Sequence, residues 1–287
     1  MASKNFLISA LVALGLCELA LAASFSYSYS APSVAVGKRL KGYNPKTGVG
    51  FAHEYGFGHY YQGDIILRPT LKAKGTRLVL TDDFAIEKWP NATVPYVIKG
   101  NFTEPQLAIL QAAMDQIAAQ SCVRFIPRTT ELIYVSFTNA DEGCYAYVGR
   151  SPFNQYNRVN LQTPECMTSL GTPVHEMLHT IGFFHEFTRD DRDEYVTIDI
   201  NNLLPEYQDP DFFETNFGKV PPSVATTYGV KYNYGSVMHY SRYAGAADLC
   251  CPVLSNLKPY FGDFGSETGL TPRDAQKINA KYCGITV

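Results

Sequence analysis

The stretch HEMLHTIGFFHEF, from His175 to Phe187, carries the strongest indication of the fold in this 287-residue chain and contains three of its six histidines. His175 and His179 are four residues apart, so an α-helix places both imidazoles on one face, within reach of a single metal ion. Glu176 is offset by about 100° around that helix. Its carboxylate can therefore reach a metal-bound water without ligating the metal, which is the place for a general base.

The third histidine, His185, lies too far along the chain to share that helix face. Gly182 is the position at which a turn could let the chain leave the helix and return His185 to the metal. Three neutral imidazoles leave one zinc position open for water, which is the catalytic arrangement. The pattern HExxH alone also occurs by chance, but the extended HExxHxxGxxH favours a catalytic zinc site.

A closed structural zinc site is the alternative interpretation of the same histidines. It would need a fourth protein ligand, usually cysteine, and the nearest, Cys166, is better used in a disulfide. His53 and His59 lie well upstream and are not expected to compete for the metal. His239 is the remaining histidine.

Charge and hydropathy exclude several classes of protein. The net charge of -3 and the pI near 6.1 carry no polyanion-binding signature, so nucleic acid is not an expected partner. Residues 1–22 combine Lys4, an apolar run and a small-x-small site ending at Ala22, which predicts a secretory signal peptide. A membrane anchor is the alternative, but the run is short and Glu18 interrupts it. We expect a secreted, extracellular protein without a membrane span.

Secretion determines how the cysteines are interpreted. Cys17 leaves with the signal peptide, so six cysteines remain, an even number that predicts disulfides in an oxidising compartment. The sequons at Asn91 and Asn101 could both be glycosylated on the secretory path.

Two changes of composition divide the remaining chain. Residues 23–77 are rich in Tyr, Ser and Gly and are not expected to form a core of their own. They end in the basic stretch LKAKGTR, which a trypsin-like protease could cut after Lys74 or Arg77, so we interpret them as a pro-segment. Residues 78–287 have a globular pattern and are expected to form one catalytic unit.

Secondary structure is predicted most clearly just after this boundary. The runs VPYVI (94–98) and LIYVSF (132–137) are β-branched and aromatic and predict strands. The stretch from Thr103 to Ser121 predicts a helix with Thr103 as N-cap. Its apolar residues recur at the helical spacing of three and four: Leu107, Leu110, Met114 and Ile117.

The stretch HEMLHTIGFFHEFTRDDRDEYV resembles the astacin family of zinc endopeptidases, within the metzincins. The match continues past the histidines through Glu186 and the pattern HExxRxDRDxYV. Further on, YNYGSVMHY resembles the family's Met-turn, with Met238 beneath the metal and Tyr240 as the tyrosine that ligates zinc in the resting enzyme. The resemblance runs from Trp89 to Cys283, the whole expected catalytic domain.

The resemblance implies a mechanism. Zinc, one ion per chain, is held by His175, His179 and His185, and Glu176 is the general base that passes a proton to the leaving amine. Tyr240 then leaves the zinc and hydrogen-bonds the oxyanion. Protein or peptide substrates are implied.

Activation is implied as well. The segment YQGDI (61–65) resembles the FxGD motif of astacin pro-segments, so Asp64 would occupy the open zinc position in the zymogen only. A surface turn is the alternative for this tetrapeptide. After cleavage, the family buries its new N-terminus, here near Leu78 to Leu80, beside the glutamate that follows the third histidine, which is Glu186. A trypsin-like activating protease is thus an expected partner.

Disulfide pairing is implied in the same way. The family's pattern pairs Cys122 with Cys283 and Cys144 with Cys166. The adjacent Cys250 and Cys251 depart from it. They could form a vicinal bridge, pair with another chain or reshuffle the assignment.

The fold implied by the resemblance is an α+β, zincin-like catalytic domain of two subdomains. The upper subdomain would hold a twisted mixed sheet and the active-site helix above the cleft, and the lower one, after Gly182, would be mostly irregular. With only four residues after Cys283, we expect a stand-alone monomer without downstream interaction modules.

Two other classes of function remain open. One is a secreted binding protein that keeps zinc without turnover, and the other is a disulfide-stapled matrix protein, suggested by the Tyr- and Ser-rich stretch before Lys38. Zinc content and turnover separate all three. An acidic residue just after the cut is often favoured in the family, but neither Arg242 nor Lys258 can be assigned to recognise it, and the natural substrate stays unknown.

Overall fold

The computed structural model describes residues 29, 31–46, 50–68 and 86–286. The expected signal peptide, the cleavage site at Lys74 or Arg77 and the expected mature N-terminus lie outside the described residues. In the described part, no helix is long and apolar enough to cross a membrane.

The described chain contains five α-helices and seven β-strands. The helices are α1 (Val34–Leu40), α2 (Glu104–Gln120), α3 (Gly171–Thr180), α4 (Pro210–Phe217) and α5 (Pro272–Tyr282). The strands are β1 (Thr93–Ile98), β2 (Arg124–Pro127), β3 (Val135–Thr138), β4 (Cys144–Ala146), β5 (Arg158–Leu161), β6 (Val196–Ile198) and β7 (Leu254–Asn256). Short 3₁₀ helices include η1 (Ala52–Gly56), which lies upstream of the sheet.

Five strands form one mixed sheet in the order β2-β1-β3-β5-β4. Neighbouring strands are parallel from β2 to β5, and β4 pairs antiparallel with β5 at the edge. The strand expected at 94–98 is confirmed as β1. The strand expected at 132–137 is wrong in its first half, because the Asn154 side chain bonds the Leu132 carbonyl and the Tyr134 amide in place of a neighbouring strand.

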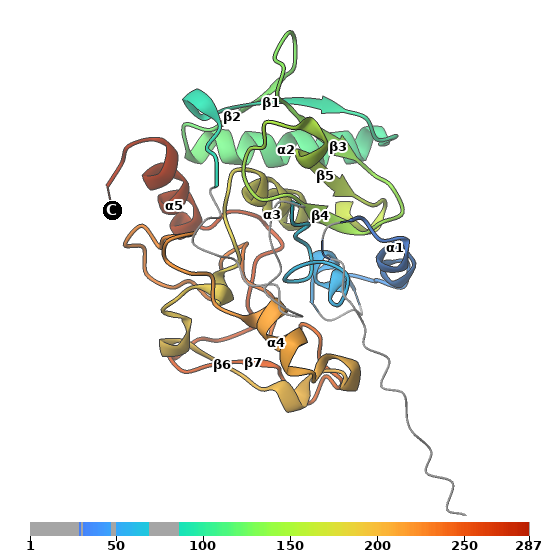
Figure 1. Ribbon diagram of the computed structural model, residues 1–287, viewed down its shortest axis with the longest axis vertical. Helices are drawn as coiled ribbons and strands as arrows, with labels where there is room; N and C mark the ends of the chain where they lie inside the picture. The colour runs from blue at the N-terminus through green and yellow to red at the C-terminus, as the bar shows by residue number, and fades with distance from the viewer. Residues whose placement is uncertain (1–28, 30, 47–49, 69–85, 287) are drawn as a thin grey trace, which may run out of the picture.

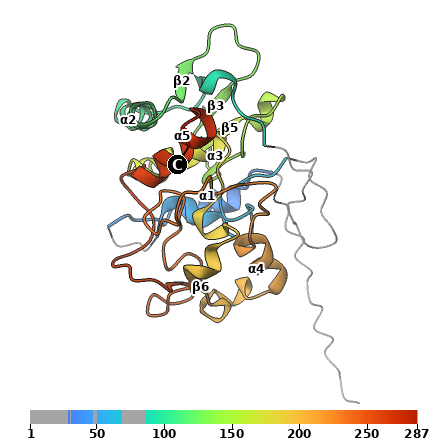
Figure 2. The same cartoon turned by 90° about the vertical axis from the view of Figure 1, so that its left-hand side faces the viewer.

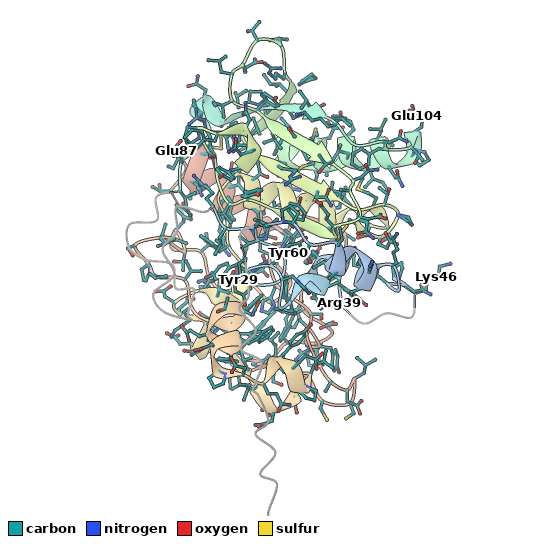
Figure 3. The ribbon with its side chains drawn as sticks, turned by 45° about the vertical axis from the view of Figure 1, so that its right-hand side comes forward. Tyr29, Arg39, Lys46, Tyr60, Glu87 and Glu104 are labelled. Carbon is teal, nitrogen blue, oxygen red and sulfur yellow. A yellow bond between two sulfur atoms is a disulfide. The ribbon has the colours of Figure 1, made fainter. Side chains whose placement is uncertain are left out.

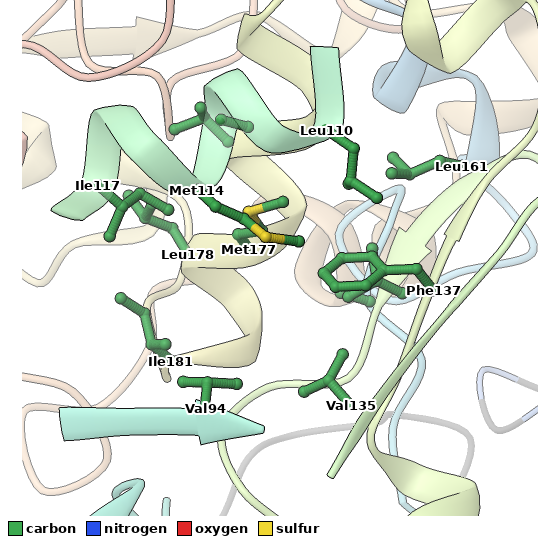
Figure 4. Close-up of a cluster of buried hydrophobic side chains, with 14 of the residues drawn as sticks. Val94, Leu110, Met114, Ile117, Val135, Phe137, Leu161, Met177, Leu178 and Ile181 are labelled. Carbon is green, nitrogen blue, oxygen red and sulfur yellow. The ribbon is translucent and has the colours of Figure 1, made fainter. Parts of the chain in front are cut away.

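Helices α2 and α3 cover one face of this sheet and pack against each other (Figure 4). Thr103 is the N-cap of α2, as predicted. Its amide also donates a hydrogen bond to the side chain of Gln106, which stabilises the start of the helix. Leu110, Met114 and Ile117 are buried between α2 and α3, whereas Leu107 is only partly buried. The expected helical face is therefore the face that builds the upper core.

A second apolar cluster lies below the sheet layer. It is built from aromatic residues on irregular segments around β6, β7 and α4, among them Phe187, Phe212, Phe217 and Phe264. Figure 1 shows the sheet, α2 and α3 together in the upper part of the molecule and β6, β7 and α4 in the lower part, and Figure 2 shows the same division from the side. The expected two-part α+β fold is confirmed. One element departs from it: α5 follows Gly182 in the chain, yet its Ile278 packs into the upper core.

The described upstream residues from 31 to 68 lie between these two parts (Figures 1 and 2). Tyr60 packs on the Tyr145 ring at 5.2 Å and donates a hydrogen bond to the Glu142 carbonyl. Arg39 donates to the Phe57 carbonyl and to the Tyr207 hydroxyl. Tyr60, labelled in Figure 3, is fully buried, whereas Arg39 is exposed at the surface of this segment. The buried side chains of this segment thus pack into clusters shared with the rest of the chain.

Two disulfides tie the upper part together. Cys122 bonds Cys283, and Cys144 bonds Cys166, which is the pairing that the resemblance implied. Cys250 and Cys251 have their sulfur atoms 2.6 Å apart and are not bonded. The vicinal bridge that the sequence left open is absent from this structure.

We expect Phe137→Ala to lower the free energy of unfolding by about 3–5 kcal/mol, because the Phe137 ring is fully buried at the centre of β3 and its removal leaves a cavity. Urea denaturation of the intact disulfide-bonded chain measures the change. Phe153→Ala is the matched control, since that ring is 59% exposed and should cost under about 1 kcal/mol. Equal effects of the two changes would contradict the assigned core.

Candidate metal centre

Helix α3 carries the first two histidines and the glutamate of the opening motif. His175, Glu176 and His179 are all fully buried in this helix. The helix ends at Thr180, and Gly182 follows with φ of +88°, a conformation that favours glycine. This turn is the one that the sequence predicted, and it brings His185 back toward the helix.

The Nε2 atoms of the three histidines lie close together and form one cluster. Nε2 of His175 lies 3.0 Å from Nε2 of His179 and 3.2 Å from Nε2 of His185. Asp64 joins them from the upstream segment, and the ligand atoms of all four residues lie within 4.8 Å of one another. The structure therefore brings together every residue that the sequence assigned to the metal, apart from Tyr240.

Hydrogen bonds on the far side of each ring orient the cluster. Nδ1 of His175 lies 2.6 Å from the Val237 carbonyl, and Nδ1 of His179 lies 2.7 Å from the Phe183 carbonyl. Carbonyl oxygens only accept, so both Nδ1 atoms carry the proton and both Nε2 atoms present a lone pair when the rings are neutral. Burial favours that neutral form, since it lowers the pKa of His175 and lowers that of His185 to about 3.

The donor set fits a zinc ion. Nitrogen lone pairs about 3 Å apart repel one another unless a cation lies between them. A tetrahedral zinc with Zn–N distances of about 2.0–2.1 Å requires neighbouring nitrogens about 3.3 Å apart, close to the 3.0 and 3.2 Å found here. Imidazole nitrogen and carboxylate oxygen are both ligands that zinc accepts.

Asp64 reaches the cluster through a tight turn of the upstream segment. Its Oδ2 lies 2.8 Å from Nε2 of His175, and its Oδ1 lies 3.1 Å from Nε2 of His185. Burial opposes its charge, but the three histidines hold the pKa of the carboxyl well below its ordinary value. Gly63 makes this approach possible, because a Cβ there would lie 2.8 Å from the Tyr240 hydroxyl. The surface-turn alternative for this tetrapeptide is wrong, since Asp64 is fully buried.

Tyr240 lies beside the histidines with its hydroxyl turned to the upstream segment. The hydroxyl donates a 2.7 Å hydrogen bond to the Gln62 carbonyl, and the ring lies 4.5 Å from that of His185. Burial raises the pKa of the phenol well above its ordinary value, so it stays protonated and able to donate. In this structure the carboxylate of Asp64, and not the phenol, completes the cluster.

Glu176 is the one group of the motif that has no partner. Both of its carboxylate oxygens are buried, and neither finds a hydrogen bond in the described part of the chain. Burial, followed by the charge of Asp64, raises the pKa of Glu176 well above its ordinary value. A buried carboxyl left without a partner costs stability, and groups retained at such a cost are candidates for function.

The segment around Met238 supports the cluster through its backbone. The Val237 carbonyl faces His175, and the Met238 carbonyl accepts from the Glu186 amide, next to His185. The Met238 side chain itself packs into the upper core, as expected for a flexible thioether.

Glu186 is already paired in this structure. Its carboxylate contacts Lys277, accepts from Arg189 at 2.9 Å and accepts from the Asn233 amide at 3.0 Å. Burial opposes its charge, but these cations, Lys277 first, lower its pKa below the ordinary value. A cavity of about 380 Å³, lined in part by Glu186 and Lys88, lies beside it.

Some residues of the site were not found from the sequence. The Val237 and Phe183 carbonyls could not be found, because a backbone carbonyl has no signature in residue type. Gln62 places its side-chain oxygen 2.9 Å from Nδ1 of His185, and its position inside YQGD could have suggested a role. His53 was expected to take no part, yet its ring stacks on that of His175 at 3.9 Å between centroids.

Comparison with known proteins agrees with this geometry. The family model described as Astacin, a peptidase family, matches residues 82–283. The chain is 34% identical over 227 residues to zinc metalloproteinase nas-8 of Steinernema carpocapsae, covering 78% of this chain and 51% of that protein. It is 41% identical over 209 residues to human Tolloid-like protein 1, covering 69% and 19%. The chain thus spans about half the length of these curated relatives or less.

A solved structure is similar as well. It is High choriolytic enzyme 1, a hatching enzyme zinc-protease of the medaka Oryzias latipes, with 29% identity and a TM-score of 0.58. The match covers 69% of this chain and 94% of that one.

Proposed function

Because the chain belongs to the astacin family of zinc metalloendopeptidases, we propose that it is a secreted endopeptidase made as a latent zymogen, with Glu176 as its general base. The observation that carries this proposal is the cluster of three histidine Nε2 atoms beside Glu176, a buried glutamate whose carboxylate has no hydrogen-bond partner among the described residues. We assign one zinc ion to His175, His179 and His185.

The chemistry divides between the metal and the side chains. When bound, zinc would polarise the scissile carbonyl and lower the pKa of a water. Glu176 would take a proton from that water and give it to the leaving amine, and its carboxylate has no hydrogen-bond partner among the described residues that would compete with this role. Tyr240, once released from Gln62, would be one of the residues that hold the resting metal, and its phenol hydroxyl would donate a hydrogen bond to the oxyanion.

The upstream segment would keep the unprocessed chain inactive. With Asp64 among the histidines, four side chains would hold a tetrahedral zinc, and no position would be left for water. The segment also extends the sheet at its edge: the Ile66 amide donates to the Ala146 carbonyl, and the Ala146 amide donates to the Asp64 carbonyl. Strand addition of this kind is a common way to bind a peptide, so it supports a segment that blocks the edge needed for substrates.

We propose that a trypsin-like protease activates the chain by cutting after Lys74 or Arg77. This divides the chain into residues 1–22, 23–77 and 78–287, as signal peptide, pro-segment and peptidase domain. The new amine would then approach Glu186 through the cavity beside it, where Lys277 now pairs with that carboxylate.

The two disulfides agree with folding in an oxidising, extracellular compartment. Asn91 and Asn101 are exposed, as glycosylation would require. We propose a monomer that acts on proteins or peptides, without nucleic acid or membrane partners.

The test is to express residues 23–287 and compare the chain before and after brief trypsin treatment. We expect hydrolysis of a denatured protein substrate to rise by at least about 100-fold on processing, because a buried carboxylate no longer occupies the metal position. The activity should disappear with a zinc chelator and return with zinc. Zinc content is measured on the same samples.

The alternatives predict other results. A folded, processed, zinc-loaded chain that cuts nothing in a broad peptide library would be a zinc-binding protein without turnover. A chain without zinc and without turnover would be a structural protein.

A further inference from the structure

A second carboxyl group of the upstream segment is buried beside Ser241, away from the metal position. Glu54, in η1, is 6% exposed. One of its oxygens accepts a 2.5 Å hydrogen bond from the Ser241 amide, and the other lies 2.8 Å from the Ser241 hydroxyl. Ser241 directly follows Tyr240, whose hydroxyl donates to the Gln62 carbonyl, so two neighbouring residues each hold one part of the upstream segment.

No cation offsets the burial of Glu54. Within the described residues, no lysine or arginine forms an ion pair with it, and burial raises its pKa to about 8. Its position therefore depends on hydrogen bonds, chiefly the two from Ser241. Departure of the upstream segment would therefore take the acceptor away from both Ser241 donors.

The residues around Glu54 fix its segment over the metal cluster. Phe51 stacks on His53 at 5.3 Å, and His53 stacks on His175 at 3.9 Å. From there the chain passes Phe57, whose ring lies 5.6 Å from that of Tyr240, before it reaches Asp64. Residues 51–64 thus form a loop around Tyr240 that is held at Glu54 on one side and at Asp64 on the other.

The sequence of the upstream segment points to the same two residues. Glu54 and Asp64 are its only acidic residues between Ala23 and Arg77. Both carboxyl groups are buried in this structure.

We propose that Ser241 is a second docking point for the upstream segment, one that takes a side-chain carboxyl group, and that Glu54 on Ser241 keeps the chain latent together with Asp64. The inference rests on the proposed zymogen function. Glu54 and Asp64 lie on one short stretch of chain, so binding of either one keeps the other at a high effective concentration near its own partner. Removal of one contact therefore leaves the other in place. Asp64 alone is therefore not the whole inhibitory contact.

The test uses residues 23–287 with Asp64→Ala, which removes the carboxylate from the metal position. Initial rates are measured without trypsin while mass spectrometry shows the chain intact, and are divided by the rate of the same sample after processing. We expect this ratio to stay below about 0.1 for Asp64→Ala. Adding Glu54→Ala should raise it about 10-fold, because the buried Ser241 donors lose their acceptor.

Glu54→Gln, added to Asp64→Ala instead, should leave the ratio within about threefold of Asp64→Ala, since an amide can still bond the Ser241 amide and hydroxyl. Lys46→Ala, at an exposed position of the same segment, is the control and should have no effect. All variants give the same mature enzyme after trypsin, so full activity after processing shows that each one has folded.

The outcomes separate the two proposals. Full activity of the unprocessed Asp64→Ala chain, or no gain from adding Glu54→Ala, would overturn the role of Glu54 while leaving the endopeptidase function intact. Absence of activity in every processed chain, including the wild type, would instead overturn the proposed function.

Discussion

Glu176→Gln is expected to lower kcat/KM of the processed enzyme by about 10²–10⁴-fold while the zinc content stays unchanged. Glutamine has the size of glutamate but cannot take up a proton, so the water would lose its base. Because Glu176 does not ligate the cluster, the three histidines and their carbonyl partners should hold the metal as before.

Stability gives a second measurement for the same variant. The carboxylate of Glu176 is buried without a hydrogen bond to any described residue, so replacing it with a neutral amide should leave the melting temperature equal or higher. Glu104→Gln, at an exposed position on α2, is the matched control and should change neither activity nor zinc content. An active Glu176→Gln enzyme would mean that another group takes the proton.

His185→Ala is expected to weaken zinc binding by more than about 100-fold, and activity should fall with it. Loss of a group that only orients a ligand typically costs about 10–100-fold in metal affinity, so loss of a ligand should cost more. Zinc is measured in the unprocessed chain after dialysis against a graded series of chelator concentrations, and activity is measured after trypsin.

His59→Ala is the control for this change, since His59 lies in the upstream segment but outside the histidine cluster. Wild-type zinc affinity in His185→Ala would show that the third ligand comes from elsewhere. The loss of zinc should also lower stability, because an ion bound only by the folded state stabilises it by about 4 kcal/mol at roughly 1,000 times its dissociation constant.

Much of the fold and the site could be predicted because the signals are local. The four-residue spacing of His175 and His179 places both side chains on one face of any α-helix. The turn at Gly182 depends only on the backbone freedom of glycine itself. The apolar spacing in α2 predicted the buried face in the same way. One prediction failed because a local pattern does not reveal a distant partner: Leu132 was expected in a strand, but the side chain of Asn154, 22 residues away, binds its backbone.

The order of residues was enough to predict the metal-ligand pattern, the neighbouring glutamate and, through the resemblance to the astacins, the disulfide pairs. Which groups surround them became known from the folded chain. The resemblance had already implied that Asp64 lies at the histidines, 111 residues away from His175. Only the folded chain places the His53 ring on that of His175 and Lys277 beside Glu186. The difference arises because the positions of residues on a helix follow directly from their spacing in the sequence. Contacts between distant segments, and contacts made by backbone carbonyls, depend instead on how the whole chain packs.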